Sequence, residues 1–179
     1  MVIPREGTRL MLTIINLNNS QKINQLNQLQ LAYIAGFIDG DGCINGQIVK
    51  SNDYKRKFKL QLSVVFFQKS SRSWFINYLH NLLNMGYVRS RKDNMSELTI
   101  KNPKEVKILI TKIIPFLIIK KPQANLILEI IDLLDGIKTD HDFLEVCKLI
   151  DKFMILNDSK KRTNTSEIVK KSLFPPVET

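Results

Sequence analysis

Two acidic residues close the segment Leu31–Gly42, which reads LAYIAGFIDGDG and holds Asp39 and Asp41 among glycines. Carboxylate oxygens are the ligands that hard divalent cations such as magnesium prefer. Divalent cations beside a phosphodiester activate water and stabilise the leaving oxygen. If a second segment of this kind lay against the first, the acids of both would meet in one place. Two such segments together would supply ligands for metal-assisted cleavage of a phosphodiester bond.

Small residues recur every four positions along this segment, at Ala32, Gly36 and Gly40. In a helix, residues spaced by four share one side, and small side chains there let a second helix approach closely. The spacing fits another structure equally well, a buried core helix that ends in a glycine-rich turn with Asp39 and Asp41 as turn formers. The spacing alone does not choose between the two.

The helix that carries the segment is expected over residues 29–39, and its apolar residues lie nearly all round, which indicates a buried helix. Strands are expected over 43–50 and 57–68, because apolar and polar residues alternate along the second of them. Ser70 and Ser71 are expected to cap a helix over 72–84. Short strands follow at 86–91 and 96–101. Prolines start helices over 103–116 and 122–134, and a last long helix is expected over 142–156.

These elements run in the order helix, strand, strand, helix, strand, strand, helix, then further helices. The connections between strands are too short for parallel crossovers, so antiparallel hairpins and an α+β fold class are expected. With 179 residues, 44% of them apolar, the chain can form one domain with a core, but not two. We expect a flexible leader over 1–26, the domain over 27–158, and a basic loop with a short helix over 159–179.

The charge of the chain is high and unevenly spread. A net charge of +10 and a pI of about 9.6 indicate a polyanionic partner. Residues 42–128 hold 16 Lys and Arg against 4 Asp and Glu, whereas residues 129–151 hold seven acids against two Lys. This segregation indicates one side that faces phosphates and another that faces water. A solubility surface without a partner is the plainer alternative.

Other chemistries have little support in the sequence. Cys43 and Cys147 form no Cys-x-x-Cys pair, so neither a zinc site nor a disulfide framework is indicated. His80 and His141 are isolated, and we assign them no chemistry. No apolar run approaches the length of a membrane span, so no membrane partner is expected. The N-terminus lacks the small-residue cleavage site of a secretory signal.

The segment Tyr33–Gly42 resembles the signature of the LAGLIDADG homing endonucleases. Further matches to the algal single-motif, I-CreI-type subfamily lie within residues 29–173: Tyr54-Lys55, Leu60-Gln61-Leu62-Ser63, Gln68-Lys69, Trp74-Phe75, Gly86-Tyr87-Val88-Arg89, Pro115-Phe116-Leu117, Gln123-Ala124-Asn125 and Leu156-Asn157-Asp158-Ser159-Lys160. The resemblance implies the αββαββα LAGLIDADG fold, with a saddle-shaped antiparallel sheet and additional C-terminal helices. It also implies a site-specific double-strand DNA endonuclease that initiates intron homing at a long pseudo-palindromic target.

By the same resemblance Asp41 is the direct metal ligand, with the Gly40 carbonyl beside it. The implied cation is Mg²⁺, and Mn²⁺ or Ca²⁺ can occupy the same site. Asp39 is then a structural residue at the helix end. The other residues implied to line the catalytic pocket are Gln68, Arg72 and Lys120. Gln68 would orient the attacking water, and the side chains of Arg72 and Lys120 would stabilise charge at the phosphate.

A two-stranded ribbon fits the major groove of double-stranded DNA, and the resemblance supports the sheet face opposite the helices as the base-reading surface. Arg and Lys suit guanine, Gln suits adenine, and Glu can accept from cytosine. Each residue could instead contact phosphate, which adds affinity without sequence information. The expected contacts are Gln47, Lys50, Tyr54, Lys57, Lys59, Gln61, Arg89, Arg91, Glu97 and Thr99.

A second basic segment, Ser159–Arg162, is expected to clamp phosphates through Lys160 and Lys161. It precedes Asn164 and Glu167, whose spacing fits a capping box at the start of a short helix. A disordered charged linker is the alternative for this loop.

The chain carries one motif. The rival segment Leu126–Gly136 has no glycine at the crossing position, and residues 137–179 are too few for a second unit. We therefore expect a homodimer whose helices cross at Ala32, Gly36 and Gly40. A two-fold dimer favours a pseudo-palindromic DNA target.

Two other functions stay open on the sequence alone. One is an RNA-binding intron maturase, whose partner is the host intron RNA, and the other is a DNA-binding module that does not cleave. The presence of Asp41, Gln68, Arg72 and Lys120 argues against the second. Lys exceeds Arg, and Ile and Asn are abundant, which suggests an AT-rich genome and hence a chloroplast or mitochondrial location.

Overall fold

A computed structural model describes residues 22–158 and 162–175 of the chain. Its α-helices and strands follow the expected order, and their bounds differ from the expected ones by a few residues. They are α2 (Gln28–Asp41), β1 (Gly42–Lys50), β2 (Phe58–Lys69), α3 (Ser73–Leu83), β3 (Tyr87–Ser90), β4 (Met95–Ile100), α4 (Pro103–Ile113), α5 (Lys121–Leu134), α6 (Asp140–Leu156) and α7 (Ser166–Leu173). Two 3-10 turns are added, η1 (Ser70–Arg72) and η2 (Ile114–Phe116). The α+β class is confirmed.

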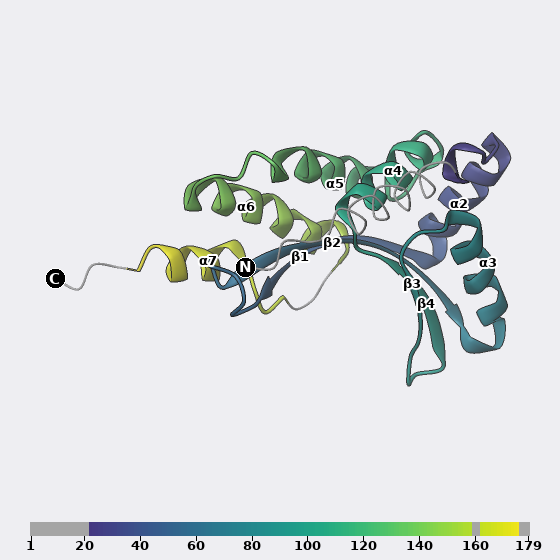
Figure 1. Ribbon diagram of the computed structural model, residues 1–179, viewed down its shortest axis with the longest axis horizontal. Helices are drawn as coiled ribbons and strands as arrows, with labels where there is room; N and C mark the ends of the chain where they lie inside the picture. Colours follow the sequence, from purple (N-terminus) through teal and green to yellow (C-terminus); the bar gives the residue numbers. More distant parts are fainter. Residues whose placement is uncertain (1–21, 159–161, 176–179) are drawn as a thin grey trace, which may run out of the picture.

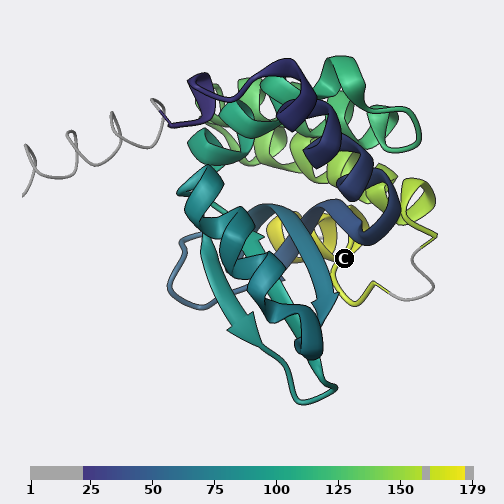
Figure 2. The same cartoon turned by 90° about the vertical axis from the view of Figure 1, so that its right-hand side faces the viewer.

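The four strands form one antiparallel sheet in the order β1-β2-β4-β3, so β2 and β4 join the two hairpins. Ile44, Val64 and Ile100 are cross-strand partners, and all three are fully buried. Even-numbered strand residues therefore face the core. Figures 1 and 2 show the helices stacked over this face of a strongly twisted sheet, whose other face forms an open arch in Figure 1.

Helix α2 begins one residue before the expected start, at a capping box that the sequence analysis did not identify. The Asn27 side chain accepts from the Gln30 backbone N–H at 2.9 Å, and the Gln30 side chain accepts from the Asn27 N–H at 3.0 Å. At its other end α2 passes directly into β1. A Cβ atom on Gly42 would lie 2.7 Å from the Cα atom of Ile38, so this passage needs glycine. The junction fixes the position of Asp41, the last residue of the helix.

The expected cap of α3 is wrong. Ser70 and Ser71 belong to η1, and α3 starts after Arg72 without a side-chain hydrogen bond at its cap. The reason is that β2 continues to Lys69, so the two serines form the turn that leaves the strand instead of preceding the helix.

The capping box expected at Asn164 and Glu167 is also wrong. Helix α7 starts one residue later, after Thr165, which makes no capping hydrogen bond with its side chain. The Ser166 N–H instead donates to the Asp151 carboxylate of α6 at 2.9 Å. A tertiary contact has replaced the local one.

Two boundaries differ in ways that matter for packing. The helix expected over 103–116 ends at Ile113 and continues as η2, which contains Pro115, a residue without an N–H donor. Ile23, which lies before the expected domain start at residue 27, is fully buried in the core.

Within residues 22–158 and 162–175, no helix is long and apolar enough to cross a membrane.

Candidate functional site

Asp39 ties the end of α2 to the loop before α5. Its carboxylate accepts from the backbone N–H groups of Ile118 at 2.8 Å, Ile119 at 3.2 Å and Lys120 at 2.9 Å. Partial burial opposes ionisation, but these three donors and the Lys120 charge together hold the pKa of Asp39 below its ordinary value. Both carboxylate oxygens are engaged, which confirms the structural role expected for this residue.

Asp41, two residues later, is exposed, and no hydrogen bond or ion pair engages its carboxylate among the residues that the structure describes. It lines a hollow of about 650 Å³ together with Gly40, Gln68 and Arg72. In this hollow the Arg72 Nε–H donates to the Gln68 Oε1 atom at 2.9 Å. Asp41 therefore offers a free carboxylate beside a polar pair.

Lys120 does not line this hollow. It is half-buried, and its Nζ donates to the backbone carbonyl of Asp39 at 2.6 Å. Three of the four expected catalytic residues therefore share one hollow, whereas the Lys120 ammonium sits against the backbone next to Gly40.

The donor set at this end of α2 suits a hard cation but is incomplete in one chain. The described residues contain no group of three or more His, Cys, Asp and Glu side chains that could hold a metal ion. Asp41 and the Gly40 carbonyl supply oxygen ligands of the kind that Mg²⁺ and Ca²⁺ take. A second copy of the chain, phosphate or water would supply further oxygens to a cation held here.

The outer side of α2 has no partner within the described residues that would explain its glycines. Gly36 and Gly40 are exposed, and a Cβ atom added to either would meet nothing within 4 Å. Large apolar side chains of α2 itself share this side, namely Leu29, which is 82% exposed, and Tyr33, which is 57% exposed. The protomer's own packing therefore does not require small residues here.

The open face of the sheet carries most of the expected DNA contacts. Cross-strand partners point to the same face, and Gln47 pairs with Gln61, while Arg89 pairs with Glu97. All four are odd-numbered and lie opposite the helix-covered side. Three more expected residues share this odd-numbered pattern: Lys59, Arg91 and Thr99.

Other expected contacts lie elsewhere. Lys50 pairs with Phe58, which is buried in the core, so Lys50 emerges on the helix side at the end of β1. Tyr54 and Lys57 are exposed in the turn that joins β1 to β2. Lys160 and Lys161 lie outside the described residues.

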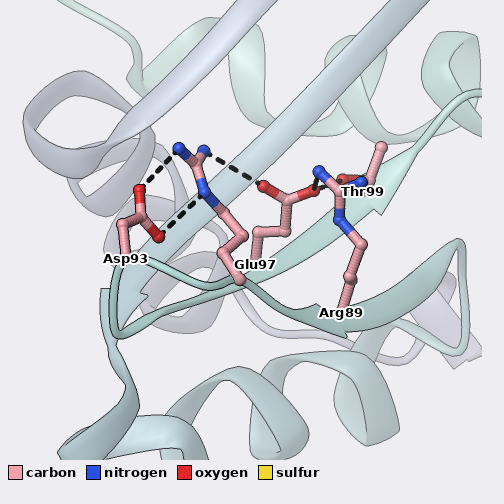
Figure 3. A network of polar contacts seen from close by, with 5 residues as sticks. Arg89, Asp93, Glu97 and Thr99 are labelled. Carbon is pink, nitrogen blue, oxygen red and sulfur yellow. Dashed lines mark hydrogen bonds and ion pairs between the residues drawn. The ribbon is translucent and has the colours of Figure 1, made fainter.

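Glu97 is the centre of a polar network on the open face (Figure 3). Its side chain is 6% exposed, and its Oε1 lies 2.8 Å from the Arg89 Nη2. The Thr99 hydroxyl donates to the same oxygen at 3.3 Å, and the Arg91 Nη1 lies 3.4 Å from Oε2. Both oxygens are therefore engaged inside the protein, which differs from the accessible cytosine acceptor that the sequence reading expected.

The sequence analysis missed Asp93, and it assigned Arg162 only to a phosphate-clamping loop. Asp93 holds Arg91 with two hydrogen bonds, at 2.7 and 3.2 Å, and keeps the pKa of Arg91 above its ordinary value. Arg162 donates to the Asn45 side chain of β1 at 2.8 Å and to the Ile150 carbonyl at 3.2 Å. The basic run predicted the charge of Arg162 but not these contacts, because they depend on which segments meet in space.

Comparison with known proteins gives a consistent result. A family model described as LAGLIDADG endonuclease matches residues 34–131. DNA endonuclease I-CvuI of Chlorella vulgaris is 38% identical over 153 residues, which cover 86% of this chain and 95% of the relative. DNA endonuclease I-CreI of Chlamydomonas reinhardtii is 43% identical over 145 residues, which cover 80% and 88%.

Solved structures agree with the sequence matches. A crystal structure of I-CvuI with the I-CreI target in 2 mM Mg, in which the DNA is not cleaved, has a TM-score of 0.79 and covers 82% of this chain and 93% of that one. Another I-CvuI complex holds its own target in 2 mM Ca. An archaeal intron-encoded homing endonuclease, I-Vdi141I, bound to DNA shares the fold at 20% identity and a TM-score of 0.71, covering 81% of this chain and 94% of that one.

Proposed function

The chain belongs to the LAGLIDADG endonuclease family, and we propose that it is a site-specific DNA endonuclease that acts as a homodimer. Each copy contributes Asp41 to the cleavage site, and the two open sheet faces bind the two halves of a pseudo-palindromic target. The activity depends on a divalent cation, in keeping with the Mg and Ca in the crystals of its relative.

The observation that carries this proposal is the free carboxylate of Asp41 at the end of a helix with exposed glycines. Close approach of a second α2 helix at Gly36 and Gly40 would use the empty space beside both residues. The exposed Leu29 and Tyr33 would be buried at the same time, which favours association. Two helix ends would then meet and bring two Asp41 carboxylates together.

The chemistry follows from the groups in the hollow. When bound, the cation would be held by the Asp41 carboxylate and the Gly40 carbonyl, and it supplies activation of water and neutralisation of charge at the phosphate. Gln68 accepts from Arg72 through its amide oxygen, which leaves its NH₂ group to orient the attacking water. Arg72 keeps its remaining N–H donors for the oxygens of the scissile phosphate.

Lys120 acts more indirectly than expected in this proposal. Its ammonium donates to the Asp39 carbonyl, so it stabilises the C-terminal end of α2, where the helix dipole is negative. Its charge lies close enough to Gly40 to favour a phosphate at the hollow.

The biological setting is proposed from the relatives. The two curated endonucleases come from green algae, and one structural neighbour is described as intron-encoded. We propose that this chain initiates the homing of its own intron in a chloroplast or mitochondrial genome.

The proposal can be tested with purified protein and a library of double-stranded DNA that carries a randomised insert. Mg²⁺ should produce cleavage at one family of related, pseudo-palindromic sequences, and EDTA should abolish it. Sequencing of both product ends would give the site. Cleavage without sequence preference, or no cleavage of any library member in Mg²⁺ or Mn²⁺, would contradict the proposal.

A further inference from the structure

The turn between β1 and β2 carries one cation that points away from the open face. Lys55 and Lys57 are exposed, whereas the Arg56 side chain is only 27% exposed. Its Nε lies 2.7 Å from the Asp140 Oδ1 atom, and the Nη2 group donates to the Lys138 carbonyl at 3.2 Å. The guanidinium also lies over the Phe143 ring, 5.2 Å from its centre. One side chain thus joins this turn to a segment 84 residues away in sequence.

The start of α6, which receives Arg56, is itself firmly built. Thr139 and Asp142 form a capping box, with backbone-to-side-chain bonds of 2.8 and 3.1 Å. The Lys138 N–H also donates to Asp142, at 3.1 Å. Phe143 is 5% exposed and belongs to the core. A fixed receptor of this kind can impose a position on whatever docks against it.

Backbone hydrogen bonds close the turn on itself, from the Ser51 N–H to the Lys57 carbonyl at 2.9 Å and from the Lys57 N–H to the Tyr54 carbonyl at 2.8 Å, but they do not tie it to the helices. A hollow of about 440 Å³, bordered by Tyr54, Leu134 and Ile137 among others, separates the turn from the helices. Lys57 adopts a left-handed backbone conformation, with φ of 57°, which is unfavourable for a residue other than glycine. A strained conformation persists only where the surroundings hold it. Arg56 is the contact that reaches across the hollow.

The consequence for DNA depends on where this turn lies. Strand β1 leaves Asp41 and runs for nine residues to Lys50, a length of up to about 30 Å at 3.3 Å per residue. One base step rises about 3.4 Å. The turn therefore reaches the outer part of a half-site, about nine base pairs from the cleavage hollow at most. The Gln47–Gln61 pair lies on the same ribbon.

We propose that Arg56 is a positioning residue: by docking on Asp140, Lys138 and Phe143 it sets the angle of the β1–β2 ribbon, and thereby the base preference at the outer positions of each half-site. Arg56 itself touches no base. The inference rests on the proposed DNA cleavage, because the ribbon's angle matters only if the open face reads DNA.

A variant at Asp140 distinguishes the loss of the Arg56 dock from the loss of a phosphate contact. Asp140 lies at the start of α6 on the helix side of the molecule, so Asp140→Asn removes the dock without removing any positive charge from the DNA side. Arg56→Gln removes the dock and one positive charge. Lys55→Gln is the matched control, because it removes one exposed charge from the same turn and leaves the dock intact.

The experiment measures the cleavage profile of wild-type protein and the three variants on libraries of singly substituted targets at two salt concentrations. Arg56→Gln and Asp140→Asn should both relax the base preference at the outer positions several-fold, symmetrically in the two halves, with the central positions unchanged. Amide exchange over residues 51–57 should be faster in both variants. Lys55→Gln should weaken binding to all sequences alike and reduce its salt dependence.

The possible outcomes separate the role of Arg56 from the proposed function. A wild-type protein without a sequence-specific profile would contradict the proposed function itself. A sharp wild-type profile that Asp140→Asn and Arg56→Gln leave unchanged at the outer positions would overturn the role of Arg56. That role is also overturned if Arg56→Gln behaves like Lys55→Gln and Asp140→Asn has no effect.

Discussion

The two hairpins of the sheet hold their cationic side chains in different ways. On β3–β4 each arginine has an acidic partner inside the hairpin, Glu97 for Arg89 and Asp93 for Arg91. On β1–β2, no acid of the described residues forms an ion pair with the expected DNA contacts Lys50, Lys57 and Lys59. Lys59 instead lies over the Tyr54 ring, 5.8 Å from its centre.

The difference suggests a division of labour. An arginine whose guanidinium is already held in place by an acid loses less side-chain entropy on binding. Its planar guanidinium can also recognise a base edge with two hydrogen bonds. A mobile lysine is a point charge, which suits phosphate. We infer that β3–β4 contributes preoriented readers of sequence. The lysines of β1–β2 contribute affinity, on a ribbon whose position is set from outside through Arg56.

The largest expected effect comes from disrupting the dimer, because each protomer then lacks the two hairpins of its partner. Gly36→Leu places a bulky side chain at the proposed helix crossing, where overpacking costs about 1–3 kcal/mol or more. We expect a monomer in sedimentation and no detectable cleavage. Lys112→Leu, at an exposed position of α4, is the control for an added apolar side chain. An unchanged dimer with unchanged cleavage would show that Gly36 does not lie at an interface.

The comparison itself is tested by Arg89→Ala beside Lys59→Ala. Loss of Arg89 should cost about 1–3 kcal/mol at one base position in each half-site and relax preference there. Loss of Lys59 should weaken binding to all sequences about equally and lower the salt slope by about one per contact. Target profiles at two salt concentrations measure both. A reversed result, with the profile altered by Lys59→Ala alone, would reverse the assignment of the two hairpins.

Glu97→Gln should weaken the base discrimination that distinguishes β3–β4 from β1–β2. It removes the buried charge that orients Arg89, and we expect a loss of about 1 kcal/mol in discrimination at the Arg89 position, in the range of couplings between contacting residues. Because one negative charge is lost, binding to non-specific DNA should tighten. Asp93→Asn is the control, since it removes one acidic partner of Arg91 and leaves the Arg89–Glu97 pair intact. In an Arg89→Ala background, Glu97→Gln should leave that position's profile unaltered, whereas a persistent change there would mean that Glu97 acts by another route.

The smallest effect concerns the two turns. Asn94, in the β3–β4 turn, has φ of 59°, and Lys57, in the β1–β2 turn, has φ of 57°. Asn adopts this left-handed conformation at a lower cost than Lys does. Lys57→Gly should therefore stabilise the protein by up to about 1 kcal/mol in urea unfolding, and Asn94→Gly should change the free energy of unfolding by a few tenths of that. Equal changes in the free energy of unfolding for Lys57→Gly and Asn94→Gly would contradict this difference between the two turns.

Local signals in the sequence predicted much of this architecture. The alternation along β2 assigned the correct faces, because side chains in a strand alternate regardless of what packs against them. It therefore placed Gln61 and Lys59 on the open side. The small residues of α2 marked a helix side that is exposed in the protomer. The family resemblance assigned Asp39 a structural role, and its carboxylate does bind three backbone N–H groups.

The remainder depends on contacts between distant segments. Glu97 was predicted to accept from a base, because its two arginine partners are identified only once the strands are in register. Arg56 meets Asp140 across 84 residues, and Ser166 is capped by Asp151 of another helix. Local propensity at Ser70 and Ser71 was outweighed by the extension of β2. Lys120 was placed in the catalytic hollow by resemblance, while its ammonium binds the Asp39 carbonyl.

In the proposed mechanism, Asp41 of each copy holds the cation for cleavage while the sheet supplies the affinity for DNA. Asp41→Asn keeps the shape of the side chain and removes the charge that binds the cation. On the selected target in Mg²⁺, we expect this variant to bind DNA within a few-fold of wild-type protein and to cut neither strand. Cleavage by Asp41→Asn at a rate close to that of wild type would contradict the account.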